Sequence, residues 1–246
     1  ALTQSMPDVC VHLAAVSSIG RARALPQDTW NVNLQGTLNL SEVLQKINPE
    51  ASFLFASTSE VYGDTFREGY ALDERALLSP ANTYATTKAA ADLALGSLAH
   101  QEFHTIRLRP FNHTGAAQKP DFVVSAFARQ LARIEAGLQP PVIEVGNLSA
   151  ERDFIDVDDI CLAYARCIEK RKNINPGTII NLCSGTARSI QSILDDLIAM
   201  FDLDIEVRSN EKLMRPIDIT KAVGCNAKAK TVLDWVPTTD WNETLD

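Results

Sequence analysis

The sequence predicts an α/β protein built on a doubly wound, parallel Rossmann-type sheet. Short apolar runs alternate with longer amphipathic runs along the chain, and this rhythm is typical of strands that are joined by helices. The short runs are apolar almost throughout, as expected for strands that are buried on both faces. From about residue 113 the pattern is less regular and richer in Pro and Gly, which predicts a second, smaller C-terminal lobe over the edge of the sheet.

Short and long runs predict the individual elements. Buried strands are expected at brief runs rich in β-branched or aromatic residues, over residues 8–15, 52–57, 104–111 and 178–184. Helices are expected where apolar residues recur with the helical period, over residues 28–47, 79–101, 121–137, 156–171 and 189–201. In the second of these helices, Ser79 is the expected N-cap and Pro80 the first helical residue. Ligands of such a sheet bind beyond the carboxyl ends of its strands.

Composition argues against several classes of protein. The net charge of -8 and the pI near 5.1 disfavour nucleic-acid binding, which usually needs a basic face. The apolar runs are too short for a membrane span and the first ten residues lack signal-peptide features, so we expect a cytoplasmic protein. Five scattered cysteines favour buried thiols over disulfides. Four histidines without an HExxH or CxxC pattern predict no metal site.

One expected pattern is missing from the sequence. No GxGxxG turn occurs, although a dinucleotide-binding sheet uses such a turn to bring pyrophosphate close to the backbone at a helix N-terminus. A single predicted strand precedes the first long helix. Either the protein binds no dinucleotide, or the sequence begins partway through the fold. The lack of an initiator methionine at Ala1 favours the second interpretation.

The stretch YATTK, residues 84–88, places a phenol beside an ammonium. Tyr84 and Lys88 lie one turn apart on the same face of a predicted helix, so their ends can share one site. A phenol has a pKa near 10, and a neighbouring ammonium favours its ionised form. Lowering that pKa by about three units requires roughly 4 kcal/mol, which is the tuning that an acid/base tyrosine needs. The alternative is a chance pair on a solvated helix face.

The stretch STSEVYG, residues 57–63, ends a predicted strand with small hydroxyl residues. Thr58 is therefore expected at the carboxyl edge of the sheet, where its hydroxyl can hydrogen-bond a reacting oxygen that Tyr84 protonates. The alternative for Thr58 and Ser59 is ordinary strand-end capping. Glu60 is either a solvent-facing turn carboxylate or a base beside the substrate.

Six segments together resemble the extended short-chain dehydrogenase/reductase family, whose members modify nucleotide-linked sugars. In order and spacing these segments are HLAAVSS, NVNLQGTLNL, STSEVYG, SPANTYATTKAAAD, RLRPFNHTG and RDFIDVDDICLAY. The resemblance covers essentially the whole chain, and the combination is specific although each motif alone is not. It implies a dinucleotide-binding Rossmann-type domain over residues 1–112 and 153–188, and a nucleotide-sugar-binding lobe over residues 113–152 and 189–246.

The resemblance also implies roles for single residues. Thr58, Tyr84 and Lys88 correspond to the catalytic triad, with Glu60 as an ambiguous fourth member. NADP or NAD would lie against Tyr84, Lys88, Leu13, Ala14, Ala15, Ser17 and His113, with Asn33 beside the active site. The substrate would be held by Asn112, Asn147, Arg152 and Arg215, and an arginine fork suits the oxygens of a diphosphate. The alternatives are an Arg152–Asp153 surface pair, a turn residue at Arg215 and a turn cap at Asn112.

Within the family, the chain most resembles the GDP-4-keto-6-deoxymannose reductases, which form GDP-rhamnose. Residues 109–159 carry this likeness, with NLCSG and MRPID after them. The GDP-mannose 4,6-dehydratases share STSE and the NH pair, but typically carry Arg-Lys where this chain has Ser125 and Ala126, and RDWGHA where it has RDFIDV. Ala116 and Ala117 stand where reductases usually carry Pro and Gly, so the local turn is uncertain.

The resemblance thus implies an NADPH- or NADH-dependent keto reduction of a GDP-linked sugar. A 4,6-dehydratase, an epimerase of another nucleotide sugar and a non-catalytic nucleotide-sugar-binding remnant stay open as alternatives. The helix that carries Tyr84 is apolar over more than one face, at Ala89, Ala90, Ala91, Leu93 and Leu95. That composition indicates either deep burial or a helix-pair interface. Because the family commonly dimerises through this helix, a homodimer is expected.

Overall fold

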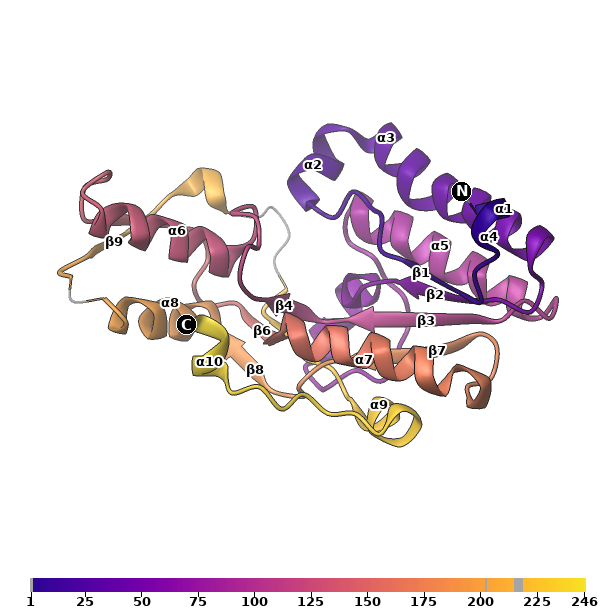
Figure 1. The fold of residues 1–246 in the computed structure, drawn as a ribbon. Coiled ribbons are helices and arrows are strands. Elements are labelled where there is room, and N and C mark those ends of the chain that lie inside the picture. The colour runs from indigo at the N-terminus through magenta and orange to yellow at the C-terminus, as the bar shows by residue number, and fades with distance from the viewer. Residues whose placement is uncertain (1, 202, 215–218) are drawn as a thin grey trace.

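The computed structural model describes residues 2–201, 203–214 and 219–246, which form a larger and a smaller lobe (Figure 1). Within these residues, the larger lobe is built on a parallel sheet with the strand order β1-β2-β3-β7. Its strands are β1 (Val9–His12), β2 (Ser52–Ala56), β3 (Thr105–Pro110) and β7 (Thr178–Leu182). The four predicted strands and the Rossmann-type fold class are confirmed. Leu54 lies opposite both Val11 and Ile106, so the strands end together at one carboxyl edge.

Helices cover both faces of this sheet (Figure 1). One face carries α3 (Pro26–Trp30), the π-helical turn η1 (Asn31–Gln35), α4 (Gly36–Ile47) and α5 (Thr83–Ala99), and the other carries α7 (Val157–Lys170) and α9 (Ala227–Leu233). Side chains alternate along β2: Phe53 and Phe55 join the cluster under α4 and α5, whereas Leu54 joins the cluster under α7. Fully burying one such side chain contributes about 1.5–3 kcal/mol, so this alternation fixes which helices cover which face.

Alanine residues bring α5 close to the sheet. Ala85, Ala89 and Ala91 are buried, and Ala91 packs in the same cluster as Phe53 and Phe55. A methyl side chain keeps the helix axis nearer to the strands than a larger residue would. The predicted apolar character of this helix on more than one face therefore reflects, in part, tight packing on the sheet.

The N-terminus of α5 differs from the prediction. Asn82 is the N-cap, and its side chain accepts a hydrogen bond from the first turn, so the expectation that Ser79 caps the helix and Pro80 starts it is wrong. The Ser79 N–H donates to the carbonyl of Val61 (3.1 Å), and the Ser79 carbonyl accepts from the N–H of Asp64 (2.9 Å). Because both backbone groups of Ser79 bind the neighbouring segment η2 (Ser59–Glu68), the helix begins only after that contact.

The smaller lobe packs helices against a short parallel ladder. It contains α6 (Val123–Glu135), α8 (Ile190–Ala199), α10 (Trp241–Leu245), β5 (Val142–Val145) and β9 (Glu206–Ser209). Its core includes Phe127, Leu131, Ile143, Ile193 and Trp241. A second small sheet of order β10-β6-β4, with β8 paired to β6, lies between the lobes (Figure 1). Its strands are β4 (Asn112–Thr114), β6 (Glu151–Asp156), β8 (Ala187–Ser189) and β10 (Lys221–Ala222).

Short helical segments complete the described chain. They are α1 (Leu2–Ser5), α2 (Ile19–Ala24), η3 (Arg171–Asn173) and η4 (Glu211–Leu213). The long predicted helices over 28–47, 121–137, 156–171 and 189–201 are all present, whereas β4, β5, β6, β8, β9 and β10 were not predicted. Most of these strands are short and lie in the segments that carry the chain between the lobes, so they lack a long apolar run that would have indicated them.

The C-terminal segment is shared between the two lobes. Ala229, Leu233 and Trp235 pack in the core below the parallel sheet, and Trp241 returns to the core of the smaller lobe. The predicted division at residues 112, 152 and 188 stays a prediction, but residues 189–246 do not form one continuous part of the smaller lobe. The reason is physical: α9 buries its apolar face against α7 and β7.

The structure also gives the state of the cysteines, the arrangement of possible metal ligands and the character of the helices. All five cysteines are free thiols. Among the described residues, no group of three His, Cys, Asp or Glu side chains is arranged to hold a metal ion. None of the helices in that part of the chain has the length and apolar character needed to cross a membrane.

Gly63 forms a sharp bend within η2 that requires glycine. Its φ is 48° and its ψ is -121°, and a Cβ there would lie 1.8 Å from the carbonyl oxygen of Ser79. We expect Gly63→Ala to lower the free energy of unfolding by well over about 1 kcal/mol, because backbone strain and a backbone clash act together.

Gly69 supplies the matched control for this prediction. Its φ is 82°, but a Cβ there would meet no atom within 4 Å, so Gly69→Ala is expected to cost only the backbone strain of about 1 kcal/mol. Urea unfolding of both variants gives the comparison. Equal losses of stability would show that the contact with Ser79 does not matter.

Candidate active site

A cleft of about 1570 Å³ lies at the carboxyl edge of the parallel sheet, where both lobes contribute to its lining. This volume exceeds the range of about 300–1,000 Å³ that is usual for a single small ligand, so the cleft can hold two sizeable molecules. The predicted site residues that line it are Leu13, Ala15, Ser17, Thr58, Glu60, Tyr84, Lys88, Asn112, His113, Asn147 and Arg152. Ala14 is not among the lining residues, and Arg215 lies outside the described residues.

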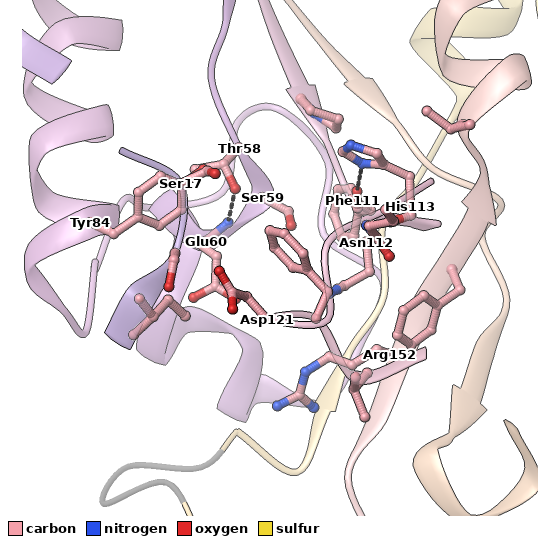
Figure 2. Close-up of a pocket in the computed structure, with 18 of the residues that line it drawn as sticks. Ser17, Thr58, Ser59, Glu60, Tyr84, Phe111, Asn112, His113, Asp121 and Arg152 are labelled. Atoms are coloured by element: carbon pink, nitrogen blue, oxygen red, sulfur yellow. Dashed lines mark hydrogen bonds between the residues drawn. The ribbon is translucent and has the colours of Figure 1, made fainter. Parts of the chain in front are cut away.

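Thr58 stands where β2 ends and η2 begins. Its backbone is extended, with φ -165° and ψ 153°, and its hydroxyl accepts a hydrogen bond from the N–H of Glu60 at 3.2 Å. Figure 2 shows this bond, with Thr58 beside Tyr84 on one side of the pocket and Asn112 and His113 on the other. Thr58 therefore caps the start of η2, which was the alternative interpretation of this residue. It also lines the cleft.

Lys88 lies on α5, one turn after Tyr84, and is 3% exposed. Its ammonium lies 4.2 Å from the centre of the Phe55 ring, within the range of a cation–π contact. Burial lowers the pKa of Lys88 to about 7, against an opposing effect of the Asp92 carboxylate. Lys88 is thus an ammonium whose charge depends on a nearby carboxylate.

The phenol of Tyr84 behaves differently from the prediction. Burial raises the pKa of Tyr84 to about 12, the interaction with the Thr58 side chain lowers it, and the charge of Glu60 raises it. The expectation that Lys88 makes this phenol acidic is not met in this structure, because burial outweighs the interactions that favour the phenolate. Tyr84 is therefore held as a neutral phenol at physiological pH, which is the protonation state of a proton donor.

The segment after β1 is fixed to the helices by Asn33. The Asn33 side chain accepts from the N–H of Val16 (2.8 Å) and donates to the Val16 carbonyl (3.1 Å) and to the Thr87 hydroxyl (3.0 Å). Asn33 lies within the π-helical turn η1, and such turns occur often at functional sites. Leu13 is 64% exposed and lines the cleft with Ser17, so this rigid segment forms one wall of the site.

The opposite wall begins with Asn112 and His113 on β4. The Nδ1 of His113 lies 2.9 Å from the carbonyl oxygen of Phe111, so this carbonyl accepts a hydrogen bond from the Nδ1–H group. Gln118 donates to the His113 carbonyl at 3.0 Å and accepts from the Thr114 hydroxyl at 2.9 Å. These bonds hold β4 in place beside the cleft.

Arg152 and Asn147 line the part of the cleft nearer the smaller lobe. The Arg152 guanidinium donates to the carbonyls of Glu151 (2.8 Å) and Ile219 (2.7 Å), and Figure 2 shows it at the lower side of the pocket. The Asn147 side chain accepts from the N–H and hydroxyl of Ser149. A side pocket of about 320 Å³ adjoins Arg152.

Glu60 and Asn82 line the same side pocket. The Asn82 amide donates to the Glu60 carboxylate at 3.3 Å, while its oxygen caps α5. Glu60 is thus not a free turn carboxylate in solvent: it is tied to the start of the helix that carries Tyr84.

The turn that follows β4 forms without the glycine that reductases usually carry. Ala117 adopts a φ of 64°, in the left-handed region where a residue with a Cβ is strained by about 1–2 kcal/mol. Ala117 thus adopts a conformation that glycine takes more readily, at a cost in backbone strain.

Several lining residues could not be found from the sequence. Asp121, Phe122, Gln130 and Glu144 also border the cleft, and Asp121 lies near the centre of the view in Figure 2. They belong to the smaller lobe and to its connection with β4, and carry no regular spacing relative to the strand-end motifs. Their place in the site depends on how the two lobes fold together.

Comparisons with known proteins agree with this architecture. The model of the GDP-mannose 4,6 dehydratase family matches residues 1–246. The chain is 32% identical over 237 residues to the GDP-6-deoxy-D-mannose reductase of Pseudomonas aeruginosa, covering 96% of this chain and 77% of that protein. It is 30% identical over 234 residues to the GDP-6-deoxy-D-talose 4-dehydrogenase of Aggregatibacter actinomycetemcomitans, covering 94% and 75%.

Solved structures give the same result. RMD from Pseudomonas aeruginosa, complexed with NADPH, superposes with a TM-score of 0.90 at 32% identity, covering 98% of this chain and 79% of that chain. A putative epimerase from Burkholderia cenocepacia superposes with a TM-score of 0.83 at 30% identity, covering 99% and 75%. The resemblance seen in the sequence is confirmed: the chain belongs to the GDP-mannose 4,6-dehydratase family of enzymes, within the extended short-chain dehydrogenases/reductases.

Proposed function

We propose that this protein uses NADPH or NADH to reduce the 4-keto group of a GDP-4-keto-6-deoxyhexose, forming GDP-rhamnose. The observation that carries the proposal is a strand-end hydroxyl, a neutral phenol and an ammonium lining one cleft, at Thr58, Tyr84 and Lys88. The 32% identity to a GDP-6-deoxy-D-mannose reductase supports it. The five free thiols support a reducing compartment, and hence a cytoplasmic location.

The residues of the cleft fit the nicotinamide half of a dinucleotide. Lys88 and Tyr84 would hold the nicotinamide ribose, and residues 13–17 with His113 would lie along the cofactor. When bound, the cofactor supplies the hydride that goes to the sugar. Because the sequence contains no GxGxxG turn, we assign none of its residues to the pyrophosphate of the cofactor. The NADPH complex of the Pseudomonas aeruginosa RMD structure supports this cofactor class.

The proton chemistry belongs to the protein's own side chains. Tyr84, neutral at physiological pH, would donate its proton to the sugar oxygen as negative charge develops there. Thr58 would orient that oxygen through a second hydrogen bond. Lys88 would contribute by holding the nicotinamide ribose, because burial, and not the charge of Lys88, dominates the pKa of Tyr84. Groups placed in advance around the point where charge develops are the main requirement of such catalysis.

The opposite wall would bind the nucleotide part of the substrate. Asn112 and Arg152 border the cleft, and a guanidinium and an amide both suit the oxygens of a diphosphate. Asn147 and Arg215 complete the substrate-binding set that the family resemblance implies. A GDP-linked sugar is the substrate class that the names of the two reported relatives share.

A 4,6-dehydratase is the second candidate. Glu60 lines the cleft beside Tyr84, and a carboxylate in that place can remove a proton next to a sugar carbonyl. The chain is also 26% identical to a GDP-mannose 4,6-dehydratase of Sordaria araneosa. A dehydratase restores its cofactor in each turnover, whereas a reductase consumes it, so the balance of NADPH distinguishes the two.

We expect Tyr84→Phe to lower kcat by at least about 10²-fold in the full-length protein, because the proton donor is lost. The assay is NADPH oxidation with GDP-4-keto-6-deoxymannose. Tyr70→Phe is the matched control, since Tyr70 is an exposed tyrosine remote from the cleft. Parental turnover in Tyr84→Phe would end the acid role, and tight substrate binding without any turnover in the parent would favour a non-catalytic binding protein.

Glu60→Gln separates the reductase from the dehydratase. In a reductase Glu60 only shapes the site, so we expect the variant to keep kcat within about tenfold of the parent, less than the loss of about 10²–10⁴-fold expected on removing a general base. Sugar products are analysed by mass spectrometry, with both GDP-mannose and its 4-keto-6-deoxy derivative as substrates. Dehydration of GDP-mannose by the parent, abolished in Glu60→Gln, would replace the reductase proposal with the dehydratase.

We also propose that the protein forms a homodimer through α4 and α5. These helices lie side by side on one face of the sheet (Figure 1). Val32, Val43 and Leu93, on and just before these helices, are between 42% and 60% exposed. Exposed aliphatic side chains on neighbouring helices suit a symmetric helix-pair interface, in which the same patch is used twice.

A charged residue at position 93 tests this interface. We expect Leu93→Glu to convert the dimer to a monomer, because it would bring two like charges together near a two-fold axis. Light scattering after gel filtration measures the mass. Leu77→Glu is the control, since Leu77 is 73% exposed on a loop outside α4 and α5. A monomeric parent, or a dimer that survives Leu93→Glu, would refute the proposed interface.

A further inference from the structure

A buried charge cluster lies behind the candidate catalytic residues. Asp92 is completely buried on α5. Its carboxylate accepts from Arg109 at Nε and Nη2, each at 3.0 Å, and from Nη1 of Arg107 at 3.1 Å. It also accepts from the hydroxyl of Ser57 at 2.6 Å. One carboxylate thus joins α5 to β3 and to the end of β2.

The two arginines are held in turn by further contacts. Arg109 donates to the Tyr62 hydroxyl at 3.0 Å, and Arg107 donates to the Gly177 carbonyl at 2.6 Å. Gly96 on α5 leaves room for this arrangement, because a Cβ there would lie 2.5 Å from the Arg107 guanidinium. The cluster is therefore rigid, and α5 is shaped to accommodate it.

The sequence positions of these partners link the cluster to the active site. Ser57 directly precedes Thr58, and its N–H donates to the Leu108 carbonyl of β3 at 2.8 Å. Asp92 follows Lys88 by one helical turn and Tyr84 by two, so all three lie on one side of α5. The bond from Ser57 to Asp92 consequently connects the strand end that carries Thr58 with the helix that carries Tyr84 and Lys88.

We propose that Asp92 is a positioning residue of the candidate catalytic centre, which fixes Thr58 relative to Tyr84 through Ser57 and places a negative charge one helical turn from Lys88. The inference rests on the proposed function for its kinetic consequence, but not for its electrostatic one. The Asp92 carboxylate is enclosed by protein groups, so it would act through its neighbours and not by contact with a substrate.

The charge on Lys88 depends on this carboxylate. Burial lowers the pKa of Lys88, and Asp92 opposes that effect. The remaining charged or titratable groups around Lys88 are His12 from β1, Tyr84 on α5, Glu60 of η2 beside Tyr84, and Arg107 and Arg109 of β3 behind Asp92. Without the carboxylate, burial would act on Lys88 unopposed, so its pKa would fall further.

The carboxylate itself keeps its charge under these conditions. Burial alone raises the pKa of Asp92, but the hydrogen bonds and charges of Arg109, with smaller effects from Ser57 and Arg107, outweigh it and bring the pKa below its usual value. Asp92 is therefore ionised across the pH range in which Lys88 titrates. The charge of Asp92 therefore stays constant over that range, so a titration there follows the proton of Lys88 and not that of Asp92.

Two variants separate the positioning from the charge. Ser57→Ala removes the hydrogen bond to Asp92 and leaves the carboxylate in place. We therefore expect kcat to fall by about tenfold, since small misplacements of reacting groups cost up to about 10²-fold. The pKa of Lys88 is expected to stay at the parental value. Asp92→Asn removes the charge, so we expect the alkaline limb of the pH profile of kcat to move to lower pH. Ser41→Ala is the matched control, since Ser41 is a buried serine whose hydroxyl donates to the carbonyl of Leu38 in its own helix.

The measurements are NADPH oxidation across pH and an NMR titration of the Lys88 side chain in the full-length protein. A lower pKa of Lys88 in Asp92→Asn supports the electrostatic role whether or not the protein reduces the proposed sugar. An unchanged Lys88 titration in that variant overturns it. Parental kcat in Ser57→Ala overturns the positioning role, and this variant decides that role even where Asp92→Asn fails to fold. Failure of the parent to oxidise NADPH refutes the proposed function and leaves the Lys88 titration as a separate result.

Discussion

The packing of α5 on the parallel sheet is the constraint on which the candidate site depends. Phe53 and Phe55 of β2 pack against the buried side of α5, and the alanines of that helix allow a short distance between helix and strand. The same packing brings the end of β2, with Thr58, beside Tyr84 and sets the Phe55 ring 4.2 Å from the Lys88 ammonium. The core packing and the arrangement of the candidate site residues therefore depend on the same contacts.

Burial of charged and polar groups gives this site its chemical character. Lys88 and Asp92 are both enclosed, and an enclosed charge is stable only when it is paired or hydrogen-bonded. The arginines of β3 supply the pairing for Asp92, and Asp92 in turn supports the charge of Lys88. Tyr84, with the carboxylate of Glu60 nearby and no cation shifting its pKa, stays neutral. Different neighbours thus set different protonation states within one helical segment.

Much of this could be predicted from the sequence, and the exceptions have physical causes. The strands at 52–57 and 104–111, and the motifs at Thr58 and Tyr84, follow from local patterns that the fold preserves. The N-cap at Asn82 was missed because the backbone of Ser79 binds a segment that precedes it by many residues. The neutral phenol of Tyr84 was missed because burial, which depends on the whole fold, outweighs the spacing to Lys88. Asp121 was missed because its place depends on how two lobes meet.

The alanine surface of α5 has a consequence for how such a site can change. Ala85, Ala89 and Ala91 are buried and carry no reactive group, yet their small volume allows the helix to lie close to the sheet. Larger residues at these positions would act as spacers that move the phenol outward from the threonine. The geometry of the candidate site thus depends partly on residues with no functional group, and a change in their size would shift Tyr84 relative to Thr58 without altering either side chain.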